Sequence, residues 1–187
     1  MDAAINTGQH FTYKDYCEWP DGERWELIDG AAYAMAAPSE AHQIVLGEIF
    51  GQLRDALKGN PCKVFIAPFS VRLNVNTSDD TVVEPDILIV CDESKRDGKG
   101  IVGAPDFIVE VLSPSTAGHD LVTKFRLYQR SGVREYWTVD PERKIAAVHV
   151  LQDGKYNSRF FNEHDDAVPV EVMDGCVINL AAVFEGL

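Results

Sequence analysis

Hydrophobic and polar residues follow one another along this chain in blocks that predict short strands and two helices. Residues 24–35 hold two short runs of strand-forming residues on either side of an Asp-Gly pair, Asp29 and Gly30, which is typical of a hairpin turn. Residues 41–59 follow Ser39, a favoured N-cap residue, and predict an amphipathic helix that ends at Gly59. Its apolar stripe consists of Ile44, Val45, Ile49, Leu53 and Leu57.

Three apolar runs after this helix predict strands. They cover residues 62–75, which are interrupted by Pro68, and residues 81–91 and 104–113. The last two are rich in β-branched residues with few polar positions, as in strands buried on both faces. Residues 92–103 are polar and predict a loop.

The remainder of the chain predicts a second helix and further strands. Residues 113–116 indicate a turn into a helix that stops at Ser131 and Gly132, and residues 134–140 indicate a strand. The helix carries Asp120, Leu121, Lys124, Leu127 and Tyr128. Residues 144–152 and 155–161 predict a hairpin around a second Asp-Gly pair.

This order of elements predicts an α/β or α+β fold in which helices cover a mixed central sheet. The 187 residues suit one domain. We divide it into an N-terminal extension (1–20), a core (about 24–151) and C-terminal strands (152–187).

The composition of the chain indicates where in the cell the protein is located and which kinds of binding partner are disfavoured. The N-terminus lacks the basic start and apolar run of a secretory signal, and no stretch reaches the roughly 18 apolar residues of a membrane span. A cytoplasmic protein without membrane association is therefore expected. Its four cysteines are widely spaced, which disfavours a zinc site or a disulfide framework and favours reduced thiols. A net charge of −13 counts against a broad nucleic-acid-binding surface.

Two of the apolar strands carry carboxylates where apolar residues are expected. Glu84 and Asp86 are two residues apart and should share a face, and Glu110 lies between Val109 and Val111. Burying an unpaired carboxylate costs several kcal/mol, so these strands suggest a shared divalent cation such as Mg²⁺. The simpler interpretations are backbone capping by Asp86 and a structural ion pair at Glu110.

Lys124 follows Asp120 by four residues on the second helix, so both lie on one face. A strand–turn–helix unit could bring Lys124 to Glu110. A metal and a lysine together can polarise a phosphoryl group and stabilise its developing charge. An exposed helix pair, worth ~0.3–0.5 kcal/mol, is the simpler alternative. A serine nucleophile, Ser113 or Ser115, activated by Lys124 is a third, although no nucleophile elbow is present.

Longer motifs resemble a known family. Pro85-Asp86 followed by Glu110 resembles the PD-(D/E)XK restriction-endonuclease-like superfamily. The segments WELIDG, APSEAHQ, EPDILIV, APDFIVEVLSPST and DLVTKFRLYQRSGVREYWTVDP, between about Trp25 and Pro141, are similar to the Uma-two family of endonucleases. The resemblance implies a restriction-endonuclease-like mixed central sheet, with helices on its faces, an N-terminal hairpin and extra C-terminal strands. It also implies a Mg²⁺- or Mn²⁺-dependent DNA endonuclease, for which a homodimer would suit cleavage of both strands.

The resemblance assigns catalytic roles to Asp86, Glu110 and Lys124. The chain departs from the superfamily motif because Leu112, and not a lysine, stands two residues after Glu110. In the similar family the lysine comes from the following helix, at the position of Lys124. The amine needs the right place in space rather than a fixed offset in the sequence.

Further site residues follow from the same comparison. The superfamily often has a glutamate on its first core helix, for which Glu48 is the candidate, so that Asp86, Glu110 and Glu48 would be the metal ligands. His42 and Glu26 match family positions, and Asp120 is a further candidate. The alternative function is a binding or regulatory module with an inactive nuclease fold.

Overall fold

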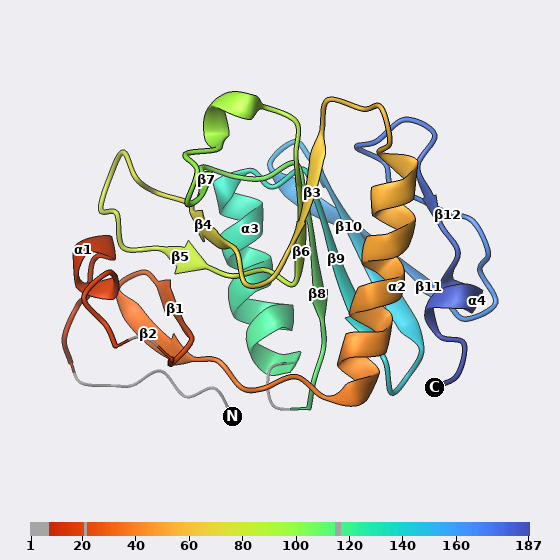
Figure 1. The fold of residues 1–187 in the computed structure, drawn as a ribbon, viewed down its shortest axis with the longest axis horizontal. Helices are drawn as coiled ribbons and strands as arrows, with labels where there is room; N and C mark the ends of the chain where they lie inside the picture. Colours follow the sequence, from red (N-terminus) through yellow and green to blue (C-terminus); the bar gives the residue numbers. More distant parts are fainter. Residues whose placement is uncertain (1–7, 21, 115–116) are drawn as a thin grey trace.

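A mixed sheet forms the centre of the computed structural model, which describes residues 8–20, 22–114 and 117–187 (Figure 1). Its strands are β3 (Lys63–Ile66), β6 (Ile87–Val90), β8 (Phe107–Val111), β9 (Glu135–Asp140), β10 (Ile145–Gln152) and β11 (Lys155–Asn162). Within the described residues they lie in the order β11-β10-β9-β8-β6-β3. β8 and β9 are parallel, and the other neighbouring pairs are antiparallel. The predicted mixed sheet and the C-terminal hairpin are confirmed.

A second sheet lies beside the first. Its strands are β1 (Trp25–Ile28), β2 (Ala31–Ala34), β4 (Ser70–Arg72), β5 (Val82–Val83) and β7 (Gly100–Val102), in the order β2-β1-β5-β4-β7. Two predicted strands were therefore too long, because each is divided between the two sheets. The first breaks at Pro68, whose peptide bond with Ala67 is cis, and the second breaks at Glu84-Pro85. β7 lies in the predicted loop, where it pairs with β4.

Two helices cover opposite faces of the central sheet (Figure 1). Helix α2 (Glu40–Ala56) starts as predicted, with the Ser39 hydroxyl accepting a hydrogen bond from the backbone N–H of His42 at 3.2 Å. Its buried stripe includes Leu46, whereas Ile44, predicted to be buried, is 40% exposed. On the other face, the π-helical turn η2 (His119–Lys124) leads into α3 (Phe125–Ser131). The predicted turn before η2 is only partly described, since Ser115 and Thr116 lie outside the described residues.

The remaining elements are short and lie towards the ends of the chain or in its loops. They are α1 (Tyr13–Tyr16), the 3₁₀ turn η1 (Glu93–Lys95), the paired strands β12 (Val168–Pro169) and β13 (Val177–Ile178), and α4 (Leu180–Val183). Among the described residues, no helix has the length and apolar character needed to cross a membrane.

Side-chain alternation along the central strands produces two separate cores. In β6, Ile87 and Ile89 face α2 and the C-terminal segment, while Leu88 faces α3 and the second sheet. In β8, Val109 belongs to the α2 core, so the next residue, Glu110, is directed towards the α3 side. The pleat of β8 thus turns an acidic side chain into the layer between the central sheet, α3 and the N-terminal hairpin.

Two cysteines are paired, contrary to the expectation of reduced thiols. A disulfide joins Cys62 and Cys91, while Cys17 and Cys176 are free. The register of β3 and β6 pairs Lys63 with Val90, so the residues one step beyond lie opposite each other. A separation of 29 residues gave no sign of this pairing in the sequence.

His149 of β10 lies in an aromatic cluster next to α3. It is 5% exposed, its Nδ1 lies 2.7 Å from the Ser158 hydroxyl, and the rings of Phe125, Tyr136 and Tyr156 surround it. Burial lowers the pKa of His149 to about 4. The imidazole therefore remains neutral in the folded protein at pH values where the unfolded chain takes up a proton.

This difference predicts a pH-dependent stability. Because the folded-state pKa is depressed, the contribution of His149 is complete above about pH 6.5 and is lost as the pH falls towards 4. The free energy of unfolding should fall by about 2 kcal/mol more between pH 7 and pH 5 in the wild type than in His149→Phe. Urea unfolding at both pH values measures the difference, and equal losses in the two proteins would contradict a neutral buried histidine.

Candidate active site

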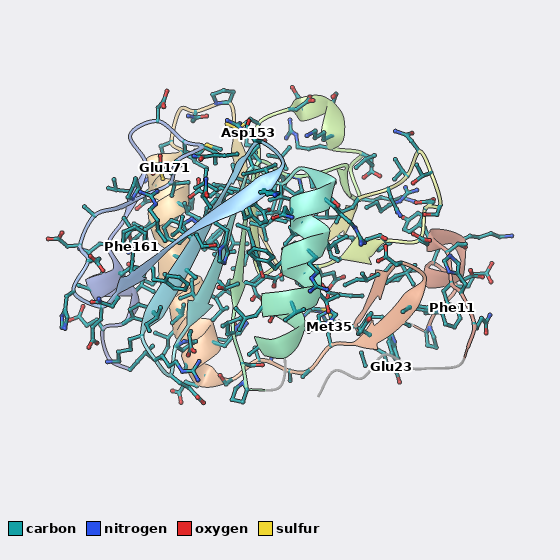
Figure 2. All side chains as sticks on the ribbon, turned by 180° about the vertical axis from the view of Figure 1, so that it is seen from behind. Phe11, Glu23, Met35, Asp153, Phe161 and Glu171 are labelled. Atoms are coloured by element: carbon teal, nitrogen blue, oxygen red, sulfur yellow. A yellow bond between two sulfur atoms is a disulfide. The ribbon has the colours of Figure 1, made fainter. Side chains whose placement is uncertain are left out.

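A pocket of about 160 Å³ lies where the N-terminal hairpin, the start of α2 and the end of β8 meet. Its lining includes Glu26, His42, Asp86, Glu110, Asp120 and Lys124. Met35, another lining residue, is labelled in Figure 2, where it lies between the hairpin and α3. The structure thus brings six of the seven predicted site residues to one pocket.

The centre of this site is a buried ion cluster around Lys124. The Lys124 Nζ lies 2.9 Å from Glu110 Oε1, 2.9 Å from Glu26 Oε1 and 3.5 Å from Asp120 Oδ1. All four residues are between 3% and 4% exposed. We call these four residues the Lys124 cluster. Its three acidic groups and single amine leave an excess of negative charge in a site shielded from water.

Three separate elements supply the Lys124 cluster. Glu26 comes from β1, where the register places it opposite Tyr33 of β2, so that both point into the pocket. Glu110 comes from β8, and Asp120 and Lys124 come from η2. The predicted meeting of Lys124 with Glu110 is therefore present in the structure, and the exposed-pair alternative for Lys124 is wrong because the amine is buried.

Tyr128 forms a further hydrogen bond with Glu110. Its hydroxyl donates to Glu110 Oε1 at 2.8 Å, and its side chain is fully buried. Tyr128 follows Lys124 by four positions and so shares its helix face, but from the sequence we expected it to pack in the core rather than to contact a site residue. That spacing was the available signal.

Burial and charge act against each other on the two central groups. Burial raises the pKa of Glu110 well above its ordinary value; the Lys124 charge opposes the shift, and the neighbouring carboxylates reinforce it. Burial by itself would lower the pKa of Lys124, but the carboxylates, with Glu110 foremost, raise it well above its ordinary value. Lys124 is therefore a permanent ammonium at neutral pH.

A permanently protonated Lys124 weakens the serine-nucleophile hypothesis. Ser113 does line the pocket, but Lys124 donates to carboxylates and has no lone pair with which to take a proton from a hydroxyl. Ser115 lies outside the described residues. The chemistry that the described residues support is electrostatic rather than nucleophilic.

Asp86 stands at the start of β6, beside Glu110. Ile87 pairs with Val109, so the same register continued by one residue places Asp86 opposite Glu110. Asp86 Oδ2 accepts the backbone N–H of Val111 at 2.8 Å and lies 3.1 Å from His42 Nε2. The backbone-capping interpretation of Asp86 is thus correct in part, and it leaves the carboxylate at the pocket wall with its side chain 16% exposed.

The imidazole of His42 is hydrogen-bonded through one of its two ring nitrogens. Its Nε2 contacts Asp86, whereas its buried Nδ1 has no hydrogen-bond partner among the residues that the structure describes. His42 lies in the first turn of α2, so the N-cap at Ser39 sets its position. Through His42, the start of α2 orients the Asp86 carboxylate.

Glu84 does not share the position of Asp86. Its carboxylate accepts two hydrogen bonds from Arg24, at 3.0 and 2.9 Å, and its backbone N–H donates to Glu26 Oε1 at 2.9 Å. The break between β5 and β6 turns it towards the hairpin. Glu84 thus lies outside the Lys124 cluster, where its side chain binds Arg24 and its backbone N–H binds Glu26 of the cluster.

Glu48 is the one predicted site residue that the structure places elsewhere. It is exposed on α2 and accepts a hydrogen bond from Gln52 at 3.1 Å. Val45, Leu46 and Ile49 occupy the buried stripe, which leaves Glu48 on the solvent side. Glu48 therefore does not join Asp86 and Glu110 as a metal ligand.

The remaining acidic groups determine whether a divalent ion fits the pocket. Across the described ranges, no group of three or more His, Cys, Asp or Glu residues is arranged to hold a metal ion. Mg²⁺, however, commonly binds through only one or two carboxylates and keeps several waters. Asp86, directly before β6, and Glu110, in β8, offer two such carboxylates beside a cluster in which three acidic groups surround one amine. The donor chemistry of these two residues fits Mg²⁺ or Mn²⁺.

Comparisons with known proteins identify the family and the fold of the chain. The Uma2 family model, described as "Putative restriction endonuclease", matches residues 13–181. An uncharacterized protein of Synechocystis sp., slr1290, is 32% identical over 147 residues, which are 76% of each chain. The crystal structure of a "putative nuclease belonging to DUF820" from Anabaena variabilis has a TM-score of 0.75 and 20% identity, covering 93% of this chain and 97% of that one.

The family match extends over the hairpin, both covering helices and the central sheet, and thus includes every element that contributes to the pocket. The structural likeness shows the same fold at low sequence identity. The chain therefore belongs to the Uma2 family of restriction-endonuclease-like proteins.

Proposed function

We propose that this protein is a Mg²⁺- or Mn²⁺-dependent endonuclease that hydrolyses phosphodiester bonds in DNA. One observation carries the proposal: Asp86 and Glu110 lie side by side at the pocket wall, with the Lys124 ammonium 2.9 Å from Glu110. The description of the Uma2 family supports it. A homodimer, which would suit cleavage of both strands, and a cytoplasmic location are further parts of the proposal.

Asp86 and Glu110 are the residues that would hold the ion. When bound, such an ion polarises a phosphoryl oxygen and lowers the pKa of a coordinated water. The hydrogen bonds from Val111 and Tyr128 fix the two carboxylates, which reduces the reorganisation needed on binding. A bound cation would also offset the negative charge that would otherwise repel a phosphate.

Lys124 has two roles in this proposal. Its charge holds Glu110 and Glu26 in position, and its ammonium lines the pocket, where it can stabilise negative charge on a transferring phosphoryl group. Arg24, which also lines the pocket and has a side chain 40% exposed, adds a cationic group nearer the solvent. These are the positive groups that an acidic protein needs beside a phosphate.

The alternative is a binding or regulatory module with an inactive nuclease fold. Two observations favour it: the net charge is −13, and the Lys124 amine is already engaged by carboxylates. The two functions differ in their need for a metal. Calorimetric titration with Mn²⁺ separates them, because an absence of binding by the folded protein at millimolar Mn²⁺ would favour the module.

The first test is cleavage of supercoiled plasmid DNA with Mg²⁺ or Mn²⁺. Asp86→Asn and Glu110→Gln preserve the shape of each side chain but remove an anionic ligand, so each should reduce the cleavage rate by about 100-fold or more. EDTA should stop cleavage by the wild type. The rate is followed as conversion of supercoiled to nicked and linear plasmid.

Glu48→Gln provides the matched control for these acidic substitutions. It makes the same change of chemistry on the exposed side of α2, and its rate should remain within about twofold of the wild type. Wild-type rates in both Asp86→Asn and Glu110→Gln would remove the two carboxylates from the mechanism.

The second test concerns the charge balance of the Lys124 cluster. Lys124→Met fills a similar volume but leaves three buried carboxylates without their cation, so the free energy of unfolding at pH 8 should fall by about 3 kcal/mol. Urea unfolding measures the loss. The double variant Glu110→Gln/Lys124→Met removes one of the stranded charges and should recover at least about 1 kcal/mol. A single variant as stable as the wild type would show that the ammonium is not needed to balance the acids.

A further inference from the structure

A second pocket lies on the other side of the N-terminal hairpin. It has a volume of about 170 Å³ and is lined by Phe11, Trp19, Pro20, Glu23, Trp25 and Ala32, which we call the aromatic pocket. Consecutive side chains of a strand point to opposite sides of the sheet. Glu26 of β1 therefore points to the Lys124 cluster, while Trp25 points to this second pocket. In Figure 2, Phe11 and Glu23 both lie at the hairpin end of the molecule, far from the β10–β11 turn at Asp153.

Three aromatic rings form the walls of the aromatic pocket at steep angles to one another. The ring centroids of Phe11 and Trp19 are 5.4 Å apart with an interplanar angle of 84°, and those of Trp19 and Trp25 are 5.7 Å apart with an angle of 66°. Edge-to-face rings make a corner rather than two parallel plates. Such a corner fits a compact, rounded group better than a flat base that stacks between two rings.

The backbone holds these rings in place. The N–H of Phe11 donates to the carbonyl of Gly30 at 2.9 Å, which ties the segment before α1 to the hairpin turn. Tyr16 packs behind Trp19 with ring centroids 5.3 Å apart, and Trp25 lies in β1 opposite Ala34. A pocket built on a paired strand and a packed aromatic row needs little rearrangement to accept a ligand.

The charge of the lining indicates the chemistry of the ligand. Among the described residues that line the aromatic pocket, Glu23 is the one with a charged side chain, and it is exposed. Aromatic faces attract cations through their quadrupole, and a carboxylate at the rim adds to this attraction. The same carboxylate and the net charge of −13 oppose a nucleotide phosphate.

We propose that the aromatic pocket binds an alkylated ammonium group, whose methyl groups contact the aromatic rings and whose charge is balanced by Glu23. The group can belong to a free quaternary amine or to a methylated lysine of a partner protein, because both present the same cation. This site is independent of the proposed nuclease chemistry, since the ion cluster lies on the opposite face of β1.

The three tryptophans of the chain make the proposal measurable by NMR. In ¹⁵N-labelled full-length protein, the indole N–H signals of Trp19 and Trp25 should shift saturably when choline is added, and Trp19→Phe and Trp25→Phe assign these signals. Trp137 is fully buried in the core between the central sheet and α2, and its indole N–H donates to Glu135 at 2.6 Å. Its signal should therefore not shift when choline is added.

A neutral analogue separates cation binding from simple apolar burial. 3,3-Dimethyl-1-butanol has nearly the shape of choline without its charge, and it should bind at least about fivefold more weakly. N-acetyl-trimethyllysine amide and N-acetyl-lysine amide form a second pair, in which the trimethylated form should bind more tightly. Comparison of choline with the trimethyllysine derivative indicates which source of the cation the pocket prefers.

Two variants complete the test. Glu23→Gln changes an exposed side chain and should fold normally, but should weaken choline binding about threefold. Glu48→Gln is the matched control and should leave it unchanged. No saturable shift up to 100 mM choline, equal binding of the uncharged analogue, or tighter binding of thymidine monophosphate would each overturn the proposal. None of these outcomes depends on whether the protein cleaves DNA.

Discussion

The buried charge of Lys124 is the constraint on which this architecture depends. An isolated ammonium in the interior would cost several kcal/mol, so its position is tenable only with carboxylates around it. Those carboxylates come from β1, β8 and η2, which belong to the second sheet, the central sheet and the helix that packs between them. One amine therefore fixes the relative placement of three elements, and that placement creates the pocket.

The cluster is also unbalanced, and this imbalance links structure to chemistry. Glu26, Glu110 and Asp120 carry more negative charge than Lys124 neutralises, with Asp86 beside them on the neighbouring strand. Burial is the largest cause of the raised pKa of Glu110; the Lys124 charge opposes the shift, and the neighbouring carboxylates add to it. In the proposed function, a cation bound by Asp86 and Glu110 would offset part of this negative charge.

Local patterns in the sequence predicted much of this arrangement, but interactions between distant segments escaped them. The hairpin at Asp29-Gly30, the N-cap at Ser39 and the meeting of Glu110 with Lys124 all follow from short-range spacing. The prediction that Glu48 points into the site was wrong. The sequence of the helix is compatible with more than one buried face, and in the structure the buried face includes Leu46 and leaves Glu48 exposed.

Long-range pairing explains the other differences. The Cys62–Cys91 disulfide depends on the antiparallel register of β3 and β6, and the formation of β7 depends on an edge offered by β4, neither of which a local pattern encodes. The role of Glu26 was implied by family resemblance alone, since a single acid in a hairpin gives no sign of a partner on a helix nearly a hundred residues away. The face of the sheet on which a charged side chain lies could be predicted from the alternation of residues along a strand. Its partner could not be predicted where the contact joins segments that are far apart in the sequence.

The most direct test of this account is an anomalous diffraction experiment on crystals soaked in Mn²⁺. One strong anomalous peak is expected in the pocket, with the ion bound by carboxylate oxygens of both Asp86 and Glu110 and the Lys124 amine still in contact with Glu110. A well-ordered pocket in which Mn²⁺ is absent at millimolar concentration, or in which the ion binds elsewhere and the carboxylates keep only their protein partners, would contradict it.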